Sequence, residues 1–295
     1  MRILKNITLF VLCLTGSTLF AQQEGVLTNF MYHMNPYNPA YVGVDGKTFI
    51  TTSFRQQWSG IKDAPSAETV SFGAALGHNL GIGVSIINSN TFVESQTFTG
   101  IDFSYHLKLE KGLDLYLGLK AGGNFYSVNT AGLQTYNVIS DPNVASISNF
   151  NPNVGVGALL KSDTWQISLA VPRMLNTERA NNEDGIVMAA VAKAHYYGTV
   201  GYNLVLDPKS NLLLKPQAMV RYVSGAPVSA DINTMLSFND NFEIGATYRT
   251  DAAAAALVNF TFKKRFLLGY AYEMSTRKVL ASARNTNEFI FRFLF

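Results

Sequence analysis

The chain has 295 residues and a formal net charge of +3, and its composition is 47% hydrophobic and 12% aromatic but only 15% charged. Soluble domains carry about 25% charged residues, so this composition favours a protein with much of its surface in contact with something other than water. The small net charge argues against a nucleic-acid partner. Phosphate-binding, dinucleotide-binding, CxxC, HExxH and EF-hand motifs are absent from the sequence, and we expect no cofactor.

The N-terminus has the pattern of a secretory signal peptide, which we expect to span residues 1–21. Arg2 and Lys5 precede an apolar run over 7–14, and small and polar residues follow it. These are the three regions of a cleavable export signal. A lipoprotein signal at Cys13 is rejected because it would cut the apolar region short. Cleavage removes the one cysteine, so thiol and disulfide chemistry are not expected in the mature chain.

No later segment approaches about 18 uninterrupted apolar residues, so a transmembrane helix is not expected. Only helices and closed barrels satisfy all their backbone hydrogen bonds in lipid. The exported chain is therefore either soluble or a β-barrel.

The segment 22–46 is expected to be a periplasmic N-terminal segment ahead of the first strand. Within it, residues 29–43 combine several aromatic residues with three Asn and two Pro. Asn-Pro steps favour turns and extended chain over helix. So many aromatics would be wasted in a solvated tail. Two interpretations stay open: a plug of the periplasmic mouth of a barrel, or a docking surface for a periplasmic partner.

From residue 47 onward, alternation of apolar and polar residues dominates and predicts strands. Leu113, Leu115, Leu117 and Leu119, for example, share one face of a strand. The predicted strands are fourteen, an even number as in single-chain bacterial barrels; they span 47–58, 67–77, 80–91, 95–109, 112–127, 152–161, 164–172, 193–206, 210–224, 228–239, 241–250, 252–263, 265–275 and 286–295.

The connections between these strands sort into two sets. If the first strand rises from the periplasm, the periplasmic turns are all short, whereas the long connections 59–66, 128–151, 173–192 and 276–285 lie at the outer end. Short periplasmic turns and long outer loops are typical of outer-membrane barrels. A soluble sandwich would show the same alternation with its faces reversed, but would not usually carry so little charge. The sequence predicts an all-β, transmembrane antiparallel barrel over 47–295.

Nine charged residues of mixed sign fall on the predicted inner face: Asp102, Lys108, Lys120, Lys215, Arg221, Asp231, Glu243, Arg249 and Glu273. They either line a water-filled pore or pair with each other and close the lumen. The histidines (His33, His78, His106 and His195) lie on different segments, without metal-ligand spacing and without an acidic partner close in sequence. We predict neither a catalytic nor a metal site.

The last strand ends in Phe289, Phe291, Phe293 and Phe295 on one face, with Arg292 on the other. One apolar face and one face that tolerates Arg suit a wall between lipid and a wet lumen. A terminal strand that ends in Phe also resembles the assembly signal of bacterial outer-membrane barrels, with Phe291, Phe293 and Phe295 as its residues. An ordinary strand packed on a soluble core is the alternative.

The run 38–43 and the run 55–65 resemble the N-terminal signature of the PorP/SprF family of type IX secretion and gliding proteins of Bacteroidota. The matching residues are Asn38, Pro39, Ala40, Tyr41, Gly43, Arg55, Gln57, Trp58, Gly60, Ala64 and Pro65. Trp58 is either an aromatic residue of the lipid interface or an anchor of the first outer loop. Val42 departs from the pattern, since the family usually has a small residue there.

The resemblance implies a non-enzymatic outer-membrane barrel that works beside the type IX secretion components. Such a barrel helps one secreted protein or adhesin to be exported or held at the surface. It would recognise this partner through the C-terminal sorting domain of the secreted protein. Loops 128–151 and 173–192 are then the expected contact surface. A passive porin or hydrophobic-solute channel is the alternative, favoured only by the inner charges, and a rim enzyme is a third.

Overall fold

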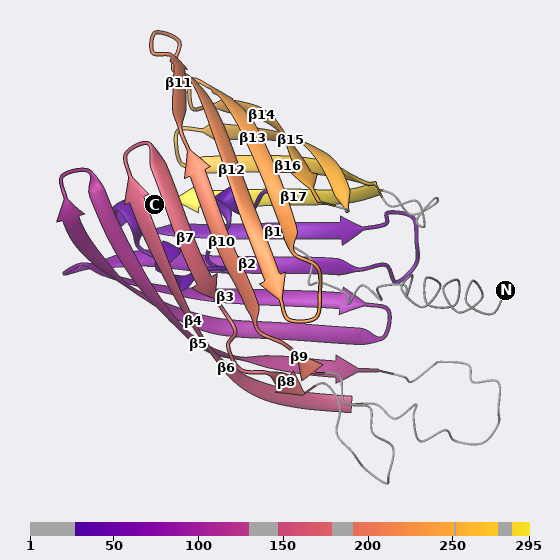
Figure 1. The fold of residues 1–295 in the computed structure, drawn as a ribbon. Coiled ribbons are helices and arrows are strands. Elements are labelled where there is room, and N and C mark those ends of the chain that lie inside the picture. The colour runs from indigo at the N-terminus through magenta and orange to yellow at the C-terminus, as the bar shows by residue number, and fades with distance from the viewer. Residues whose placement is uncertain (1–26, 130–146, 179–190, 251, 277–284) are drawn as a thin grey trace, which may run out of the picture.

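The computed structural model describes residues 27–129, 147–178, 191–250, 252–276 and 285–295. These residues form a closed, 14-strand antiparallel β-barrel, in which β10 and β11 together make one strand of the wall, interrupted at Asn203. Figure 1 shows the strands curving around a common interior. The fold class predicted from alternation is confirmed.

The wall strands are β1 (Phe49–Gln57), β2 (Ser66–Gly77), β3 (Leu80–Thr91), β4 (Glu94–Glu110), β5 (Leu113–Val128), β6 (Ile147–Ser162), β7 (Trp165–Val171), β10 (His195–Tyr202), β11 (Leu204–Asp207), β12 (Leu212–Val223), β13 (Ser229–Phe238), β14 (Phe242–Arg249), β15 (Ala253–Phe262), β16 (Phe266–Ser275) and β17 (Asn285–Leu294). A separate two-stranded sheet pairs β8 (Thr177–Glu178) with β9 (Val191–Ala192).

The ring closes between the first and last strands of the chain. β1 runs antiparallel to β17, with Phe49 opposite Leu294 and Gln57 opposite Thr286. Every other wall strand pairs with its neighbour in chain order, including β10 with β12. Closure gives each of the fourteen described wall strands a neighbour on both sides, so the sheet has no edge strand, which is the condition for a sheet to lie in lipid.

Most strand boundaries differ from the predicted ones by one or two residues, and three of the differences have a visible cause. β6 begins at Ile147 rather than at 152, because β5 pairs with it along its whole length. β1 begins at Phe49 rather than at 47, because the Lys47 N–H is bonded to the Val44 carbonyl in a preceding 3-10 turn. The expected strand 193–206 is divided at Asn203 into β10 and β11. The Asn203 N–H donates to the Thr164 carbonyl, just ahead of β7.

Three of the tight turns use two consecutive residues with left-handed backbone. They are His78 and Asn79, Asn239 and Asp240, and Lys263 and Lys264. This conformation matches the right-handed twist of hairpin strands. The lysine pair adopts it without Gly, Asn or Asp, the residues by which such turns are usually recognised in a sequence.

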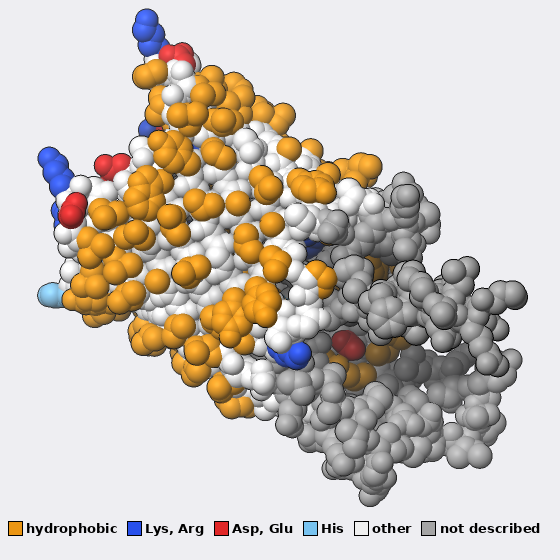
Figure 2. Space-filling model, viewed as in Figure 1, with side chains coloured by type: hydrophobic (Ala, Val, Ile, Leu, Met, Phe, Trp, Pro, Cys, Tyr) orange, Lys and Arg blue, Asp and Glu red, His pale blue; other side chains and the backbone are white. Residues whose placement is uncertain are grey.

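The barrel is apolar outside and polar inside. Leu119 and Leu169 on the outer face are 63% and 67% exposed, whereas Asp102, Asp231 and Asn233 on the inner face are fully buried. In Figure 2, hydrophobic side chains cover the visible wall, and charged side chains gather toward its ends. A soluble sandwich would bury its apolar faces, so this polarity decides for a membrane barrel.

Candidate functional site: the plugged lumen

Residues 27–48, here called the plug, run through the barrel before entering β1 (Figure 1, indigo). The plug contains three single-turn 3-10 helices, η1 (Phe30–Tyr32), η2 (Pro39–Tyr41) and η3 (Val44–Gly46). Its side chains and backbone contact wall strands around the whole circumference. Much of the expected N-terminal segment 22–46 therefore lies inside the lumen.

The upper end of the plug, nearer the long loops, is bonded to a buried carboxylate of the last strand. Both oxygens of Glu288 accept backbone N–H groups, from Thr28 and from Asn29, each at 2.7 Å. Glu288 is fully buried. A carboxylate on free N–H groups at the start of a helical turn makes strong, charge-assisted bonds, so Glu288 fixes where the plug begins.

Glu288 is one end of a chain of ion pairs along the inner wall. The chain runs Arg221–Asp231–Arg249–Glu273–Arg55–Glu288, with alternating sign. Arg55 lies 2.7 Å from Glu273 and 3.2 Å from Glu288, and also donates to the Thr28 hydroxyl at 2.8 Å. The six side chains come from six strands, and we call them the charge ladder. It leaves its charges paired, so the closed-lumen interpretation of the inner charges fits the structure.

The middle of the plug is held by neutral and cationic groups. His33 is buried with its two ring nitrogens 2.8 Å from the hydroxyls of Ser53 and Ser71. Burial, with Arg292 and Lys120 nearby, lowers the pKa of His33 to about 3. Its imidazole is therefore neutral at ordinary pH, as two hydroxyl partners permit.

Two cations of the wall donate to plug carbonyls. Arg292 donates to the Tyr32 carbonyl at 2.6 Å, and Lys120 donates to that of Asn35 at 3.2 Å. The Tyr32 hydroxyl in turn bonds the Glu243 carboxylate, and burial is the largest cause that raises the pKa of Tyr32. These contacts pin the segment to both sides of the barrel.

The lower half of the plug docks on glycines. Asn38 caps η2 by accepting the Ala40 N–H at 2.9 Å, and its amide donates to the Ala158 carbonyl at 3.2 Å. Pro39 occupies the first position of η2, where its missing N–H costs nothing. A Cβ at Gly118 would overlap Ala40, and one at Gly157 would overlap Asn38.

The Val42–Gly43 step uses two further glycines. The Ser104 hydroxyl bonds the Val42 carbonyl at 2.5 Å. Gly43 has φ of 71°, and a Cβ there would lie 2.9 Å from the Gly81 Cα. A Cβ at Gly83 would overlap the Val42 side chain. The residues Asn38 to Gly43 of the signature thus fit a groove that only glycine leaves open.

The second signature run joins the barrel wall to the first outer loop. Arg55 points into the lumen and belongs to the charge ladder. The Gln57 N–H bonds the Pro65 carbonyl at 2.8 Å, so the loop closes on the end of β1. The remaining residues of the run lie in this loop: Trp58 with φ of 49°, Gly60 with φ of 97°, and Ala64, whose carbonyl accepts from Gln56 at 3.5 Å. The second run contacts the plug through the bond from Arg55 to Thr28, a residue that lies ahead of the first run.

The terminal phenylalanines lie on the outer face, as the alternation predicted. Phe289 and Phe295 are 54% and 61% exposed, and Phe291 is exposed too. The ring of Phe293 packs on that of Phe295, with centroids 4.7 Å apart. The role of Phe291, Phe293 and Phe295 as an assembly signal stays a prediction.

The inner face holds the charged residues that the alternation placed there. Lys120 pairs with Asp102 at 3.0 Å and Lys215 with Glu243 at 2.8 Å, whereas Lys108 is exposed near the short-turn end. The expectation that no histidine has an acidic partner close in sequence was wrong for His106, whose Nε2 lies 2.7 Å from Asp114 across the β4–β5 hairpin.

Within the described ranges, no cluster of three or more His, Cys, Asp or Glu could hold a metal ion. Among the helices of the described residues, none is long and apolar enough to cross a membrane.

Sequence reasoning missed Glu288, His33 and the glycines of the inner wall as parts of one site. Alternation along the last strand does place Glu288 inward, with Arg292, so the direction of its side chain could be predicted. Its hydrogen-bond partners could not be predicted, because Thr28 and Asn29 lie about 260 positions away in the sequence.

The sequence from residue 19 to 293 matches the family model of the type IX secretion system membrane protein PorP/SprF. The chain belongs to the PorP/SprF family. It is therefore a membrane barrel of the type IX secretion system, and its fold and family place it in the outer membrane. The family-like run from Asn38 to Gly43 is the part of the plug that docks in the groove left by the wall glycines. No curated protein sequence matches the chain.

Solved structures similar to this PorP/SprF barrel are outer-membrane barrels. The outer membrane protein Omp33 of Acinetobacter baumannii has a TM-score of 0.50 and 9% identity, over 85% of this chain and 99% of its own. The KdgM porin has a TM-score of 0.40 and 9% identity, over 84% of this chain and 99% of its own. At such identities the likeness to Omp33 shows the fold alone.

Proposed function

We propose that this PorP/SprF barrel assists the export or surface attachment of one specific secreted protein and catalyses no reaction itself. The observation that carries the proposal is the occupied lumen: the plug contacts the wall on all sides, and the charges around it are paired. A barrel whose interior is taken up in this way is suited to present a surface rather than to pass solutes.

The passive-porin alternative requires a continuous aqueous path. A porin lumen is lined by charges that face water, whereas here the ladder residues face each other and the backbone of the plug. Conductance of the purified protein in planar bilayers separates the two functions. We expect no large steady current; a large, stable, ohmic current from every inserted barrel would favour the porin.

The surface that we propose for partner recognition is formed by loops 128–151 and 173–192, with the C-terminal sorting domain of the secreted protein as the ligand. Residues 130–146 and 179–190 lie outside the described residues. At the root of the second loop, the guanidinium of Arg173 lies over the Phe98 ring at 5.3 Å. The loop also carries Glu178, Arg179, Asn181, Asn182, Glu183 and Asp184, a polar set suited to a protein partner.

Deleting each loop tests this assignment. Removal of 130–146 or of 179–190 is expected to abolish surface display of the cognate protein while the barrel still assembles. Removal of 277–284, another long connection at the same end, is the matched control and is expected to leave display intact. Unchanged display in both loop deletions would count against recognition by these loops.

We also propose that residues 1–21 are removed as a signal peptide, so that the mature chain begins at Gln22. The charged start and apolar run support it. N-terminal sequencing of protein isolated from outer membranes checks the cut, and a retained Arg2 would contradict it.

A further inference from the structure

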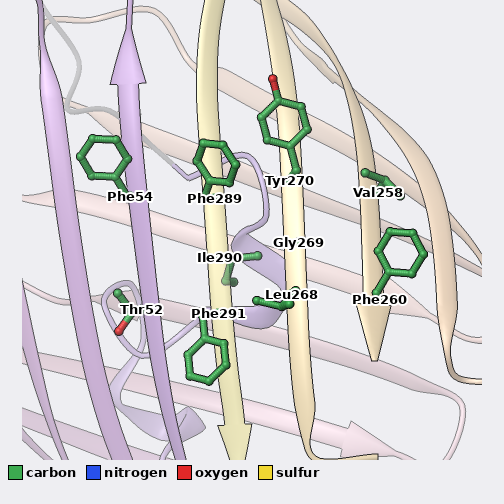
Figure 3. Close-up of a pocket in the computed structure, with 10 residues that line it drawn as sticks. All are labelled: Thr52, Phe54, Val258, Phe260, Leu268, Gly269, Tyr270, Phe289, Ile290 and Phe291. Carbon is green, nitrogen blue, oxygen red and sulfur yellow. The ribbon is translucent and has the colours of Figure 1, made fainter. Parts of the chain in front are cut away.

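A groove opens on the lipid-facing side of the barrel, across the seam where the first and last strands meet. It has a volume of about 370 Å³ and an almost wholly apolar lining from β1, β15, β16 and β17 (Figure 3). Because it lies on the outer wall, it faces the hydrocarbon of the membrane and is separate from the plugged lumen.

Strand register explains why a groove forms here. Phe54, Phe289, Tyr270 and Val258 stand opposite one another in one row across the four strands, and Thr52, Phe291, Leu268 and Phe260 stand in the next. Rows on one face of a sheet are about 7 Å apart along the strands. Figure 3 shows the aromatic rings of the two rows beside the shorter side chains of Thr52 and Val258. The difference in height leaves a trough lined by both rows.

The upper end of the groove is polar. The Tyr270 hydroxyl donates to the Asn287 side chain at 2.6 Å, and the Asn287 amide donates to the Ser59 hydroxyl at 2.6 Å. Tyr at such a position is typical of the membrane–water boundary. The groove is thus amphipathic along its length, with an apolar trough below and hydrogen-bonding groups above.

We propose that this groove binds one acyl chain of a membrane lipid, with the lipid headgroup at Ser59, Tyr270 and Asn287. The occupant follows from the surroundings: the groove belongs to the band of the wall that hydrocarbon covers. An unfilled trough would forfeit the dispersion contacts of its lining. The rings on the flanks of the groove restrict the acyl chain between them, so this lipid exchanges slowly.

The test uses the full mature protein in phosphatidylcholine vesicles that contain a phospholipid with a nitroxide near its acyl terminus. Electron paramagnetic resonance counts the strongly immobilised lipids per barrel. Val258→Trp fills the trough, and Val200→Trp, at a 50% exposed valine on the outer face of β10, is the control outside the groove. We expect Val258→Trp to lose one immobilised lipid per barrel and Val200→Trp to lose none.

A second pair of variants covers the case in which the larger side chain prevents assembly. Phe260→Ala removes one wall of the groove, with Phe103→Ala on β4 as its control, and we expect faster lipid exchange in the first variant only. Native mass spectrometry of protein from outer membranes should show one lipid adduct that Val258→Trp lacks. An equal immobilised count in wild type, Val258→Trp and Phe260→Ala would overturn the proposal, as would a polypeptide adduct instead of a lipid.

Discussion

The contact between Glu288 and the plug can be tested by a single isosteric change. Glu288→Gln keeps the shape of the side chain but leaves one acceptor oxygen where two oxygens now accept the N–H groups of Thr28 and Asn29. It also removes the negative charge 3.2 Å from Arg55. The upper end of the plug is therefore expected to leave its site more often.

The size of the effect follows from what loses its partner. One buried N–H without an acceptor costs about 1–3 kcal/mol, and breaking a buried ion pair costs about 3–5 kcal/mol. Arg55 keeps Glu273 at 2.7 Å, so the second cost is only partly incurred. We expect a loss of about 3 kcal/mol in plug docking, which corresponds to roughly a hundredfold in the docking equilibrium.

Hydrogen exchange measures this directly. In wild type, amides at the upper end of the plug should be strongly protected, and in Glu288→Gln they should exchange roughly a hundredfold faster. Glu68→Gln, on an exposed part of β2, is the control and should leave exchange unchanged. Protection of Thr28 and Asn29 that is equal in wild type and Glu288→Gln would refute the assignment of Glu288 as the anchor.

Three other changes test the plug and the last strand. Gly157→Ala should destabilise plug docking by about 1–3 kcal/mol through overpacking against Asn38, seen as faster proteolysis of the plug, whereas Gly201→Ala, whose nearest neighbour atoms lie at 3.4 Å, should not. His33 is neutral in the docked plug, where its pKa is about 3, whereas the side chain of a released plug is protonated near pH 6.5. The docked plug therefore has its full stability above pH 6.5 and loses stability as the pH falls toward 3. At pH 5 the free energy of plug docking is smaller by about 2 kcal/mol than at a pH well above 6.5. Hydrogen exchange of the plug amides at these two pH values measures the difference. A pH dependence that persists in His33→Gln would contradict an origin in His33. Phe295→Ser should reduce the heat-modifiable, assembled form in outer membranes, and unaltered assembly would remove Phe295 from the signal.

Most of the barrel wall could be predicted from local patterns in the sequence. Alternation placed Leu119 outside and Lys120 inside, and the structure has them so. It worked because the side-chain period of a strand is two and the two faces of this wall meet different solvents. The interruption at Asn203 could not be predicted from alternation, because it depends on where β7 begins: its first residue, Trp165, pairs with Tyr202, the last residue of β10.

The path of the plug was less predictable than the wall. The aromatics of residues 29–43 indicated a buried segment, and both interpretations placed it at the periplasmic end. Its contacts with Glu288, Ser71 and Gly157 join positions far apart in the chain, for which no periodic signal exists. Glycine inside a strand does indicate a close backbone approach. Gly118 and Gly157 therefore indicated that another segment packs closely there, but not that this segment is the plug.

The charge ladder explains how the lumen of this barrel can be filled by the plug while its inner wall stays charged and polar. Burying six charges stabilises a fold less than packing hydrophobic side chains would, so the ladder is not needed for stability alone. Its signs alternate from Arg221 to Glu288, which leaves the carboxylate of Glu288 facing the plug at one end. Any shift of the plug by one residue would separate Glu288 from the two N–H groups. The ladder therefore fixes the position of the plug at Thr28 and Asn29, and the glycine groove fixes it at Asn38 to Gly43. Together these contacts hold the plug in one position inside the barrel.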